Sequence, residues 1–181
     1  MNASNYDKWK GTDAVYVATI FLDCVNQELI EMAKEIPGLE AVVRGAEKGR
    51  PLGLGLLGFH TYLQEHMIPF ESIEAMDFND DIFDHLQSEA LRASKYLAEK
   101  LGEPEWCEGF GVRNTHRTAQ APTKSTAGLM GGMSESTSAD PAWVFTAGSA
   151  AGELPRIPPI FLEVMKEKGK YNQETIDDII K

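Results

Sequence analysis

Apolar residues recur with a helical period over much of the first hundred positions. Between Asp13 and Ile36 they stand at steps of three and four, which predicts an amphipathic helix. These apolar residues are Val17, Ile20, Phe21, Cys24, Val25, Leu29 and Met32. A second amphipathic helix is predicted from Asn79 to Leu101, with Asp80 and Asp81 at the positive end of its dipole.

Shorter elements follow from turn signals. The pattern predicts helices over 39–49 and over 158–169. It also predicts a helix that ends near His66 and another that begins after Asn172, a suitable cap. Between 107 and 159 the chain is rich in Gly, Ser, Thr, Ala and Pro, which favours loops. Its two candidate strands are "THRTAQA" (115–121) and "AWVFTAG" (142–148).

Composition limits the class of protein. The 181 residues, 43% of them hydrophobic, suffice for one domain with a core. A formal net charge of -11 argues against a nucleic-acid partner, because phosphate-backbone binding needs clustered Lys and Arg. No apolar run reaches the roughly 18 residues of a membrane span, and the N-terminus lacks a signal peptide's apolar core. We therefore expect a soluble, cytoplasmic chain with no membrane partner, whose Cys24 and Cys107 are reduced thiols.

Two other patterns resemble binding motifs but do not predict a binding site. "GLGLLG", Gly53 to Gly58, matches the dinucleotide-binding letters G-x-G-x-x-G, but that motif requires a buried strand before the glycines. The preceding "GAEKGRP" is charged and broken by proline, so we expect close packing between backbone segments instead. The histidines and cysteines lack zinc-site spacing, and "DFNDDIFD" lacks the glycine and glutamate of a calcium loop. No metal site is predicted.

One short stretch has candidate binding chemistry. "PTKST", Pro122 to Thr126, combines a proline that fixes the chain direction with three hydroxyl groups and a lysine. "TAGLMGG", which overlaps its end, can start a helix whose first amides attract an anion. The Walker pattern G-x-x-x-x-G-K-[ST] is absent. An ordinary helix cap uses the same residue types, so composition leaves a cap and a phosphate cradle both open.

Three separated stretches together resemble the large, catalytic subunit of class I ribonucleotide reductase, especially the form carried by T4-like phages. They are "RPLGLGLLGFHTYLQ" (50–64), "RNTHRTAQAPTKSTA" (113–127) and "GSAAGELPRIPPIFLEVMKEKGKY" (148–171). The resemblance covers essentially the whole chain, in order. It implies an α/β, mostly helical segment of the family's ten-stranded α/β barrel. That single segment, 1–181, would be mainly helical over 1–105 and would hold the phosphate loop, short strands and terminal helices over 106–181.

The resemblance also implies a role for the "PTKST" loop. In this family a P-[ST]-x-[ST]-[ST] loop binds the phosphates of the ribonucleotide, which the enzyme reduces to a deoxyribonucleotide by radical chemistry. By resemblance, the substrate's phosphates would be held by Pro122, Thr123, Lys124, Ser125 and Thr126. The radical would come from a separate, metal-containing small subunit, and no cofactor is expected in this chain.

The chain departs from the family where the chemistry occurs. The family mechanism needs a thiyl-forming cysteine in an N-x-C-x-E context and a reducing cysteine pair, and neither Cys24 nor Cys107 lies in such a context. The radical-passing tyrosine pair is missing too. We therefore assign no catalytic residue and expect the isolated chain to be inactive. Its expected partners are the remaining fragments of the large subunit, the small subunit and a ribonucleotide.

Other hypotheses remain open from the sequence. The chain could be a stand-alone nucleotide-phosphate-binding or scaffold protein that lost catalysis, or a gene remnant. A phage-encoded chain would act in the host cytoplasm. A partial barrel would expose unpaired strand edges and apolar helix faces, so we expect self-association or poor solubility when it is expressed alone.

Overall fold

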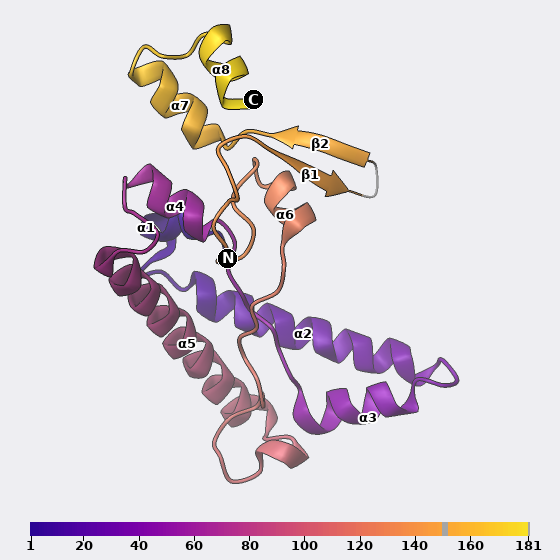
Figure 1. Cartoon of the computed structure of the whole chain (residues 1–181). Helices are drawn as coiled ribbons and strands as arrows, with labels where there is room; N and C mark the ends of the chain where they lie inside the picture. Colours follow the sequence, from indigo (N-terminus) through magenta and orange to yellow (C-terminus); the bar gives the residue numbers. More distant parts are fainter. Residues whose placement is uncertain (150–151, 181) are drawn as a thin grey trace. The chain divides into compact units, whose positions relative to one another are not determined.

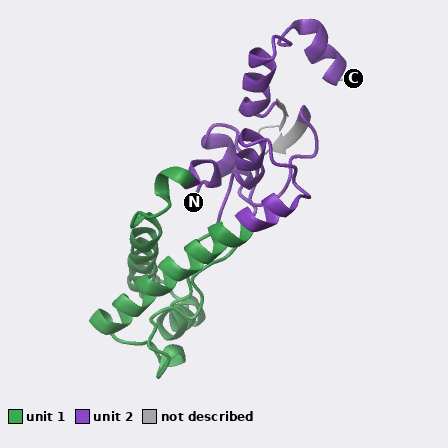
Figure 2. Cartoon of the chain, turned by 90° about the vertical axis from the view of Figure 1, so that its left-hand side faces the viewer, with its two compact units in different colours: residues 1, 7–55, 79–120 green, residues 2–6, 56–78, 121–181 purple. Residues whose placement is uncertain are grey.

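The computed structural model describes residues 1–149 and 152–180. The chain forms two compact units, coloured separately in Figure 2. Unit 1 comprises residues 1, 7–55 and 79–120, and unit 2 comprises residues 2–6, 56–78 and 121–181. Each unit joins segments that are far apart in the sequence.

The described residues are mostly helical, as predicted, with one two-stranded antiparallel hairpin (Figure 1). The elements in chain order are η1 (Ala3–Asn5), α1 (Tyr6–Trp9), α2 (Ala14–Lys34), α3 (Glu40–Gly49), α4 (Phe59–Glu65), α5 (Ile73–Leu101), η2 (Glu105–Cys107), α6 (Lys124–Leu129), β1 (Phe145–Ser149), β2 (Gly152–Arg156), α7 (Pro159–Glu167) and α8 (Gln173–Ile180).

Helix positions agree well with the sequence prediction, with one shift. Helices α2, α3, α4, α7 and α8 lie where the pattern placed them, and the Asn172 side chain accepts a hydrogen bond from the Thr175 amide, as a cap does. Helix α5 begins six residues before Asn79, so the expectation that Asp80 and Asp81 start it is wrong. The Ser72 hydroxyl accepts from the Ala75 amide (3.2 Å) and provides the earlier start.

Unit 1 contains a helical hairpin. Helix α3 packs against the C-terminal half of α2 (Figure 1), and a small apolar cluster of Ile30, Ala33, Val43 and Ala46 joins them. On α5, a buried stripe supplies a further part of the apolar interior. It consists of Ile82, Leu86, Ala90, Ala93 and Leu97. These positions repeat at steps of three and four, as expected for a core-facing helix.

Helix α2 does not bury the face that its apolar pattern marks. Val17, Phe21 and Met32 are 58%, 64% and 61% exposed, and Val25 and Leu29 are exposed as well. The buried face carries three polar residues among its six members, which are Val15, Thr19, Asp23, Asn26, Ile30 and Ala33. The pattern therefore predicted the helix correctly, but an apolar stripe normally faces a core and this one does not.

Two extended segments of unit 1 run in parallel. The Leu52 amide donates to the His116 carbonyl (2.8 Å), the Leu54 amide donates to the Arg117 carbonyl (3.1 Å), and Leu54 and Thr118 form a parallel bridge. The strand predicted at 115–121 is wrong, because this segment forms only an isolated bridge at Thr118. Helix α3 continues to Gly49, so no strand leads into the glycine motif, as expected, and the pairing of Leu54 with Thr118 is an isolated bridge.

Unit 2 has an aromatic core and the hairpin. The Phe78 ring stacks on Tyr62 (3.9 Å between centroids) and on Phe59 (5.3 Å), and it meets Tyr6 edge-on. Strands β1 and β2 pair antiparallel from Phe145 opposite Arg156 to Ser149 opposite Gly152. Strand β1 overlaps the prediction at 142–148. Among the helices of the described residues, none is long and apolar enough to cross a membrane.

Candidate functional site

The predicted phosphate loop lies in unit 2, at the start of α6. Pro122 is exposed, as are Lys124, Ser125 and Thr126 in the first turn, while Ala127 is fully buried and anchors the helix. The first amides of a helix have no partner inside it, and no side chain caps α6. The loop therefore presents backbone donors, two exposed hydroxyl groups and an ammonium group together.

Thr123 occupies the cap position of α6 without capping it. Its hydroxyl oxygen accepts a hydrogen bond from the Ser136 amide (2.8 Å), and its carbonyl accepts from the Ala127 amide (2.7 Å). The ordinary side-chain cap, one of the two alternatives open from the sequence, is not formed. Thr123 instead ties the start of the loop to the segment that returns after α6.

A buried hydrogen-bonded pair fixes that returning segment. The Thr61 amide donates to the Ser134 hydroxyl (3.0 Å), and the Ser134 amide donates to the Thr61 hydroxyl (2.8 Å). The Ser134 carbonyl also accepts from the Gly58 amide (2.9 Å). Thr61 and Ser134 are 2% and 0% exposed. A continuous polar path thus runs from the start of α4 through residues 134–136 to the phosphate loop.

Glycines shape both ends of this path. Gly58, the last residue of the glycine motif, has a φ of 76°, and a Cβ there would lie 2.6 Å from the Asn2 side chain. Gly131 and Gly132, with φ of 99° and 80°, turn the chain back after α6. Close packing is the expectation for this motif, and the geometry at Gly58 agrees with it.

His60 adds a titratable group beside the returning segment. Its Nδ1 accepts a hydrogen bond from the Asp140 amide (3.0 Å) and lies 3.5 Å from the Asp140 carboxylate. Its ring meets Phe70 edge-on at 5.6 Å. Because Nδ1 accepts, the neutral ring carries its proton on Nε2. His60, which lies on α4, thus holds Asp140 beside that helix. Asp140 follows the buried Ser134 in the same returning segment.

Unit 1 contains a buried charge cluster that the sequence analysis missed. The Arg50 guanidinium donates to both carboxylate oxygens of Asp23 (2.9 and 3.0 Å), and Arg113 Nε also donates to that carboxylate (3.2 Å). Asn114 Nδ2 donates to Asp23 (2.9 Å), and the Ser94 hydroxyl donates to Asn114 Oδ1 (2.8 Å). The only sequence signal was a polar residue, Asp23, on an amphipathic helix.

The environment sets the charge of Asp23. Burial alone would raise the pKa of this carboxyl, but hydrogen bonds from Arg50 and Asn114, together with the charges of Arg50 and Arg113, lower it below its ordinary value. The carboxylate is therefore ionised at neutral pH, as a structural ion-pair centre.

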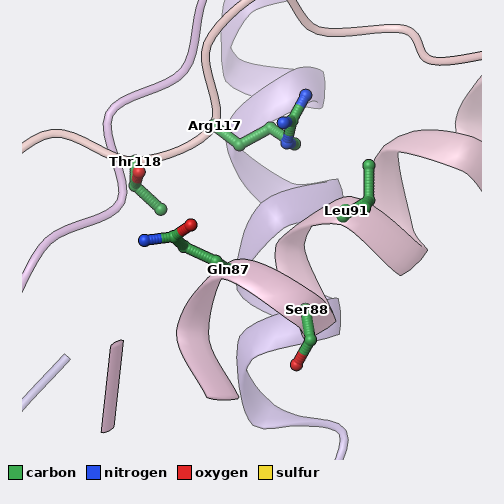
Figure 3. Close-up of a pocket in the computed structure, with 5 residues that line it drawn as sticks. All are labelled: Gln87, Ser88, Leu91, Arg117 and Thr118. Atoms are coloured by element: carbon green, nitrogen blue, oxygen red, sulfur yellow. The ribbon is translucent and has the colours of Figure 1, made fainter. Parts of the chain in front are cut away.

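A small pocket also lies in unit 1 and is shown in Figure 3. Its volume is about 180 Å³, and α5 and the extended segment line it through Gln87, Ser88, Leu91, Arg117 and Thr118. In Figure 3 the Gln87 side chain points toward Thr118, whereas the Ser88 hydroxyl points away from it. No residue of the phosphate loop lines this pocket.

The cysteines differ in environment. Cys24 is exposed on α2 and Cys107 is buried in η2, and both are free thiols. Burial, and then the charge of Glu103, raise the pKa of the Cys107 thiol against an opposing effect of Arg117. Among the described residues, no three His, Cys, Asp or Glu side chains gather in a way that could hold a metal ion.

Comparison with known proteins defines the class. The family described as "Ribonucleotide reductase, barrel domain" matches residues 1–110 and 104–181. The chain therefore belongs to this family, and it covers part of the barrel domain. Its homologues are large subunits of ribonucleoside-diphosphate reductase.

Individual relatives show how much of such a subunit is covered. A Frog virus 3 relative of this class is 34% identical over 99% of this chain and 32% of its own length. The large subunit of Invertebrate iridescent virus 3 is 34% identical over 96% of this chain and 27% of its own. A solved structure, the Actinobacillus ureae class Id ribonucleotide reductase alpha subunit, superposes with a TM-score of 0.88 at 39% identity, over 99% of this chain and 33% of that one. The chain thus spans about a third of these relatives.

Proposed function

We propose that this chain supplies the substrate-phosphate loop and part of the barrel of a ribonucleotide reductase large subunit. In this proposal the enzyme reduces ribonucleotides to deoxyribonucleotides in assembly with the remaining parts of the large subunit. One observation carries the assignment of the loop: the first turn of α6 is uncapped and exposed, with Ser125 and Thr126 beside its open amides.

The loop's chemistry suits an anionic phosphate group. Backbone amides at a helix start point along the axis, toward the position an anion would take, and hydroxyl groups add donors that rotate to fit. Lys124 adds a positive charge on a flexible stem. The helix has only six residues, so local donors contribute more than its dipole. Thr123 and Pro122 set the path of the chain into this turn.

The remaining parts of the proposal concern what completes the enzyme. The cysteines that the family mechanism needs would come from other segments of the large subunit, and the radical from a metal-containing small subunit. A reductase of the T4-like phage form, acting in the host cytoplasm, remains our specific assignment. The relatives from Frog virus 3, Invertebrate iridescent virus 3 and Actinobacillus ureae support the large-subunit class as a whole.

The test is a double substitution, Ser125→Ala with Thr126→Ala, in the assembled reductase. We expect ribonucleotide affinity to fall by about 1 to 3 kcal/mol, the scale for lost hydrogen bonds to a charged group. Ser138→Ala, which removes an exposed hydroxyl outside the loop, is the matched control and should leave affinity unchanged. Equal affinity of the double variant and the wild type, measured by equilibrium dialysis, would show that the phosphates bind elsewhere.

A further inference from the structure

Helix α2 has its apolar face outside and its polar face inside. We define the α2 stripe as Val17, Phe21, Val25, Leu29 and Met32, all exposed. They recur at steps of four and three, so they share one side of the helix over about 22 Å at 1.5 Å per residue. The opposite side carries Thr19, Asp23 and Asn26 in the interior of unit 1.

The buried charge cluster prevents α2 from turning its stripe inward. Asp23 receives hydrogen bonds from Arg50, Arg113 and Asn114, all within unit 1. Arg50 also donates to the Asp23 carbonyl (3.0 Å) and to the Gln27 side chain (2.9 Å). Rotation of the helix would break these bonds and leave buried charges unpaired, which is strongly unfavourable. The outward direction of the stripe is therefore a fixed feature of the fold.

We propose that the α2 stripe is the docking surface for another part of the reductase large subunit. This inference rests on the proposed function, since it names the partner that the barrel segment requires. Large contiguous apolar patches are rare on the surfaces of soluble proteins and mark sites that another surface covers. The five stripe residues carry no charge, but Glu28 lies on the same side of the helix, so a covering segment must leave its carboxylate in water or give it a positive partner.

This chain covers only part of the length of its relatives, which supports the rest of the large subunit as the partner that covers the α2 stripe. The Actinobacillus ureae subunit reproduces the fold of this chain at a TM-score of 0.88, yet the chain accounts for 33% of it. The same backbone arrangement therefore exists within a polypeptide about three times as long. Two thirds of that polypeptide are available to cover α2.

Charge disfavours the main competitor, a second copy of this chain. Each copy carries a formal net charge of -11. The exposed carboxylates Glu28, Glu31 and Glu35 lie on α2 or at its end, near the stripe. Two copies paired through α2 would bring these like charges together, which opposes association. A covering segment of different sequence has no such constraint.

The chain provides its own probe of coverage. Cys24 is exposed on α2, three residues after Phe21 and next to Val25, whereas Cys107 is buried. We would measure the rate of iodoacetamide alkylation of both thiols by peptide mass spectrometry. The chain would be compared alone and assembled with the rest of the reductase large subunit of the same source. We expect Cys24 alkylation to slow by at least about tenfold on assembly, while Cys107 stays slow in both states.

Variants connect that protection to the stripe. Phe21→Glu with Val25→Glu adds two negative charges to exposed positions, so the isolated chain should keep its melting temperature. It should bind the rest of the large subunit at least about tenfold more weakly. Lys95→Glu changes the net charge by the same amount at an exposed position on α5 and should bind normally.

Each result supports or overturns the proposal. Assembly with Cys24 unprotected, or normal binding by the Phe21→Glu, Val25→Glu variant, would overturn the docking surface and leave the proposed function standing. A homodimer that the same variant abolishes, without binding to the rest of the subunit, would show that a second copy covers the stripe. Protection of Cys24 together with unchanged nucleotide affinity of the Ser125→Ala, Thr126→Ala variant would keep the docking surface and refute the loop assignment.

Discussion

Arg50 and Asp23 form a two-pronged ion pair inside unit 1, with guanidinium-to-carboxylate distances of 2.9 and 3.0 Å. Their side chains are 5% and 3% exposed. Arg50 follows α3 in the left-handed conformation (φ 44°, ψ 50°), a position that glycine usually takes. The pair thus joins α2 to the end of α3 and to the extended segment that begins at Pro51.

The first prediction concerns this pair. Asp23→Ala should destabilise the chain by about 3 to 5 kcal/mol, because it leaves the buried guanidinium groups of Arg50 and Arg113 unpaired. Urea unfolding measures the effect. Asp13→Ala breaks an exposed pair with Arg92 and should cause little change. Similar losses for the two variants would mean that burial does not decide the strength of these ion pairs.

The second prediction is a dependence of stability on pH. The folded-state pKa of Asp23 lies below its ordinary value, so its contribution is complete above the unfolded pKa of about 3.9. The contribution is lost as the pH falls through the folded pKa. Thermal unfolding between pH 7 and pH 2 should show a steep acid loss in the wild type and a shallower one in Asp23→Asn. Parallel curves would contradict the assignment.

The third prediction tests close backbone packing at the glycine motif. A Cβ at Gly55 would lie 2.2 Å from the Ala119 carbonyl oxygen, so Gly55→Ala must displace backbone and should cost about 1 to 3 kcal/mol. Gly45, inside α3, has open space at the same position. Gly45→Ala should therefore stabilise the chain by about 0.5 to 1 kcal/mol. The opposite order of melting temperatures would disprove the packing account.

The fourth prediction concerns the support of the phosphate loop. Ser134→Ala leaves the buried Thr61 amide without its acceptor and should destabilise unit 2 by about 1 to 3 kcal/mol. In the assembled reductase it should also weaken nucleotide binding, because residues 134–136 hold Thr123. Ser134→Thr keeps the hydroxyl group. It should bring nucleotide affinity closer to the wild-type value than it brings the free energy of unfolding. If Ser134→Ala leaves nucleotide affinity unchanged, the Thr61–Ser134 pair does not support nucleotide binding at residues 122–126.

The fifth prediction uses the two thiols of the isolated chain. Burial and Glu103 raise the pKa of Cys107, so its reactive thiolate is scarcer at neutral pH than that of an ordinary cysteine. Alkylation at pH 7.5 should modify the exposed Cys24 first. Cys107 should react appreciably only at higher pH or after denaturation. Equal rates at pH 7.5 would show that η2 opens readily.

The helices were predictable because their signals are local. Periodic apolar residues, Pro37-Gly38 after α2 and the Asn172 cap before α8 act within a few residues of one another. The start of α5 was misplaced because two aspartates suggested a later helix start, while the Ser72 hydroxyl provides an earlier one. The extended segment at 52–54 escaped prediction because its partner lies about 65 residues away and supplies the backbone bonds.

The candidate site likewise has some features that the local sequence predicts and others that depend on tertiary contacts. The sequence by itself marked residues 122–126 as the candidate phosphate loop, since the proline, hydroxyl groups and helix start are adjacent in the chain. Only the tertiary structure decided that Thr123 bonds Ser136 rather than capping α6, and that Ser134 pairs with Thr61. It also decided which face of α2 is buried. A periodic pattern identifies two faces of a helix. Which face turns inward is determined by Arg50 and Asn114, the partners of Asp23, which lie far from it in the sequence.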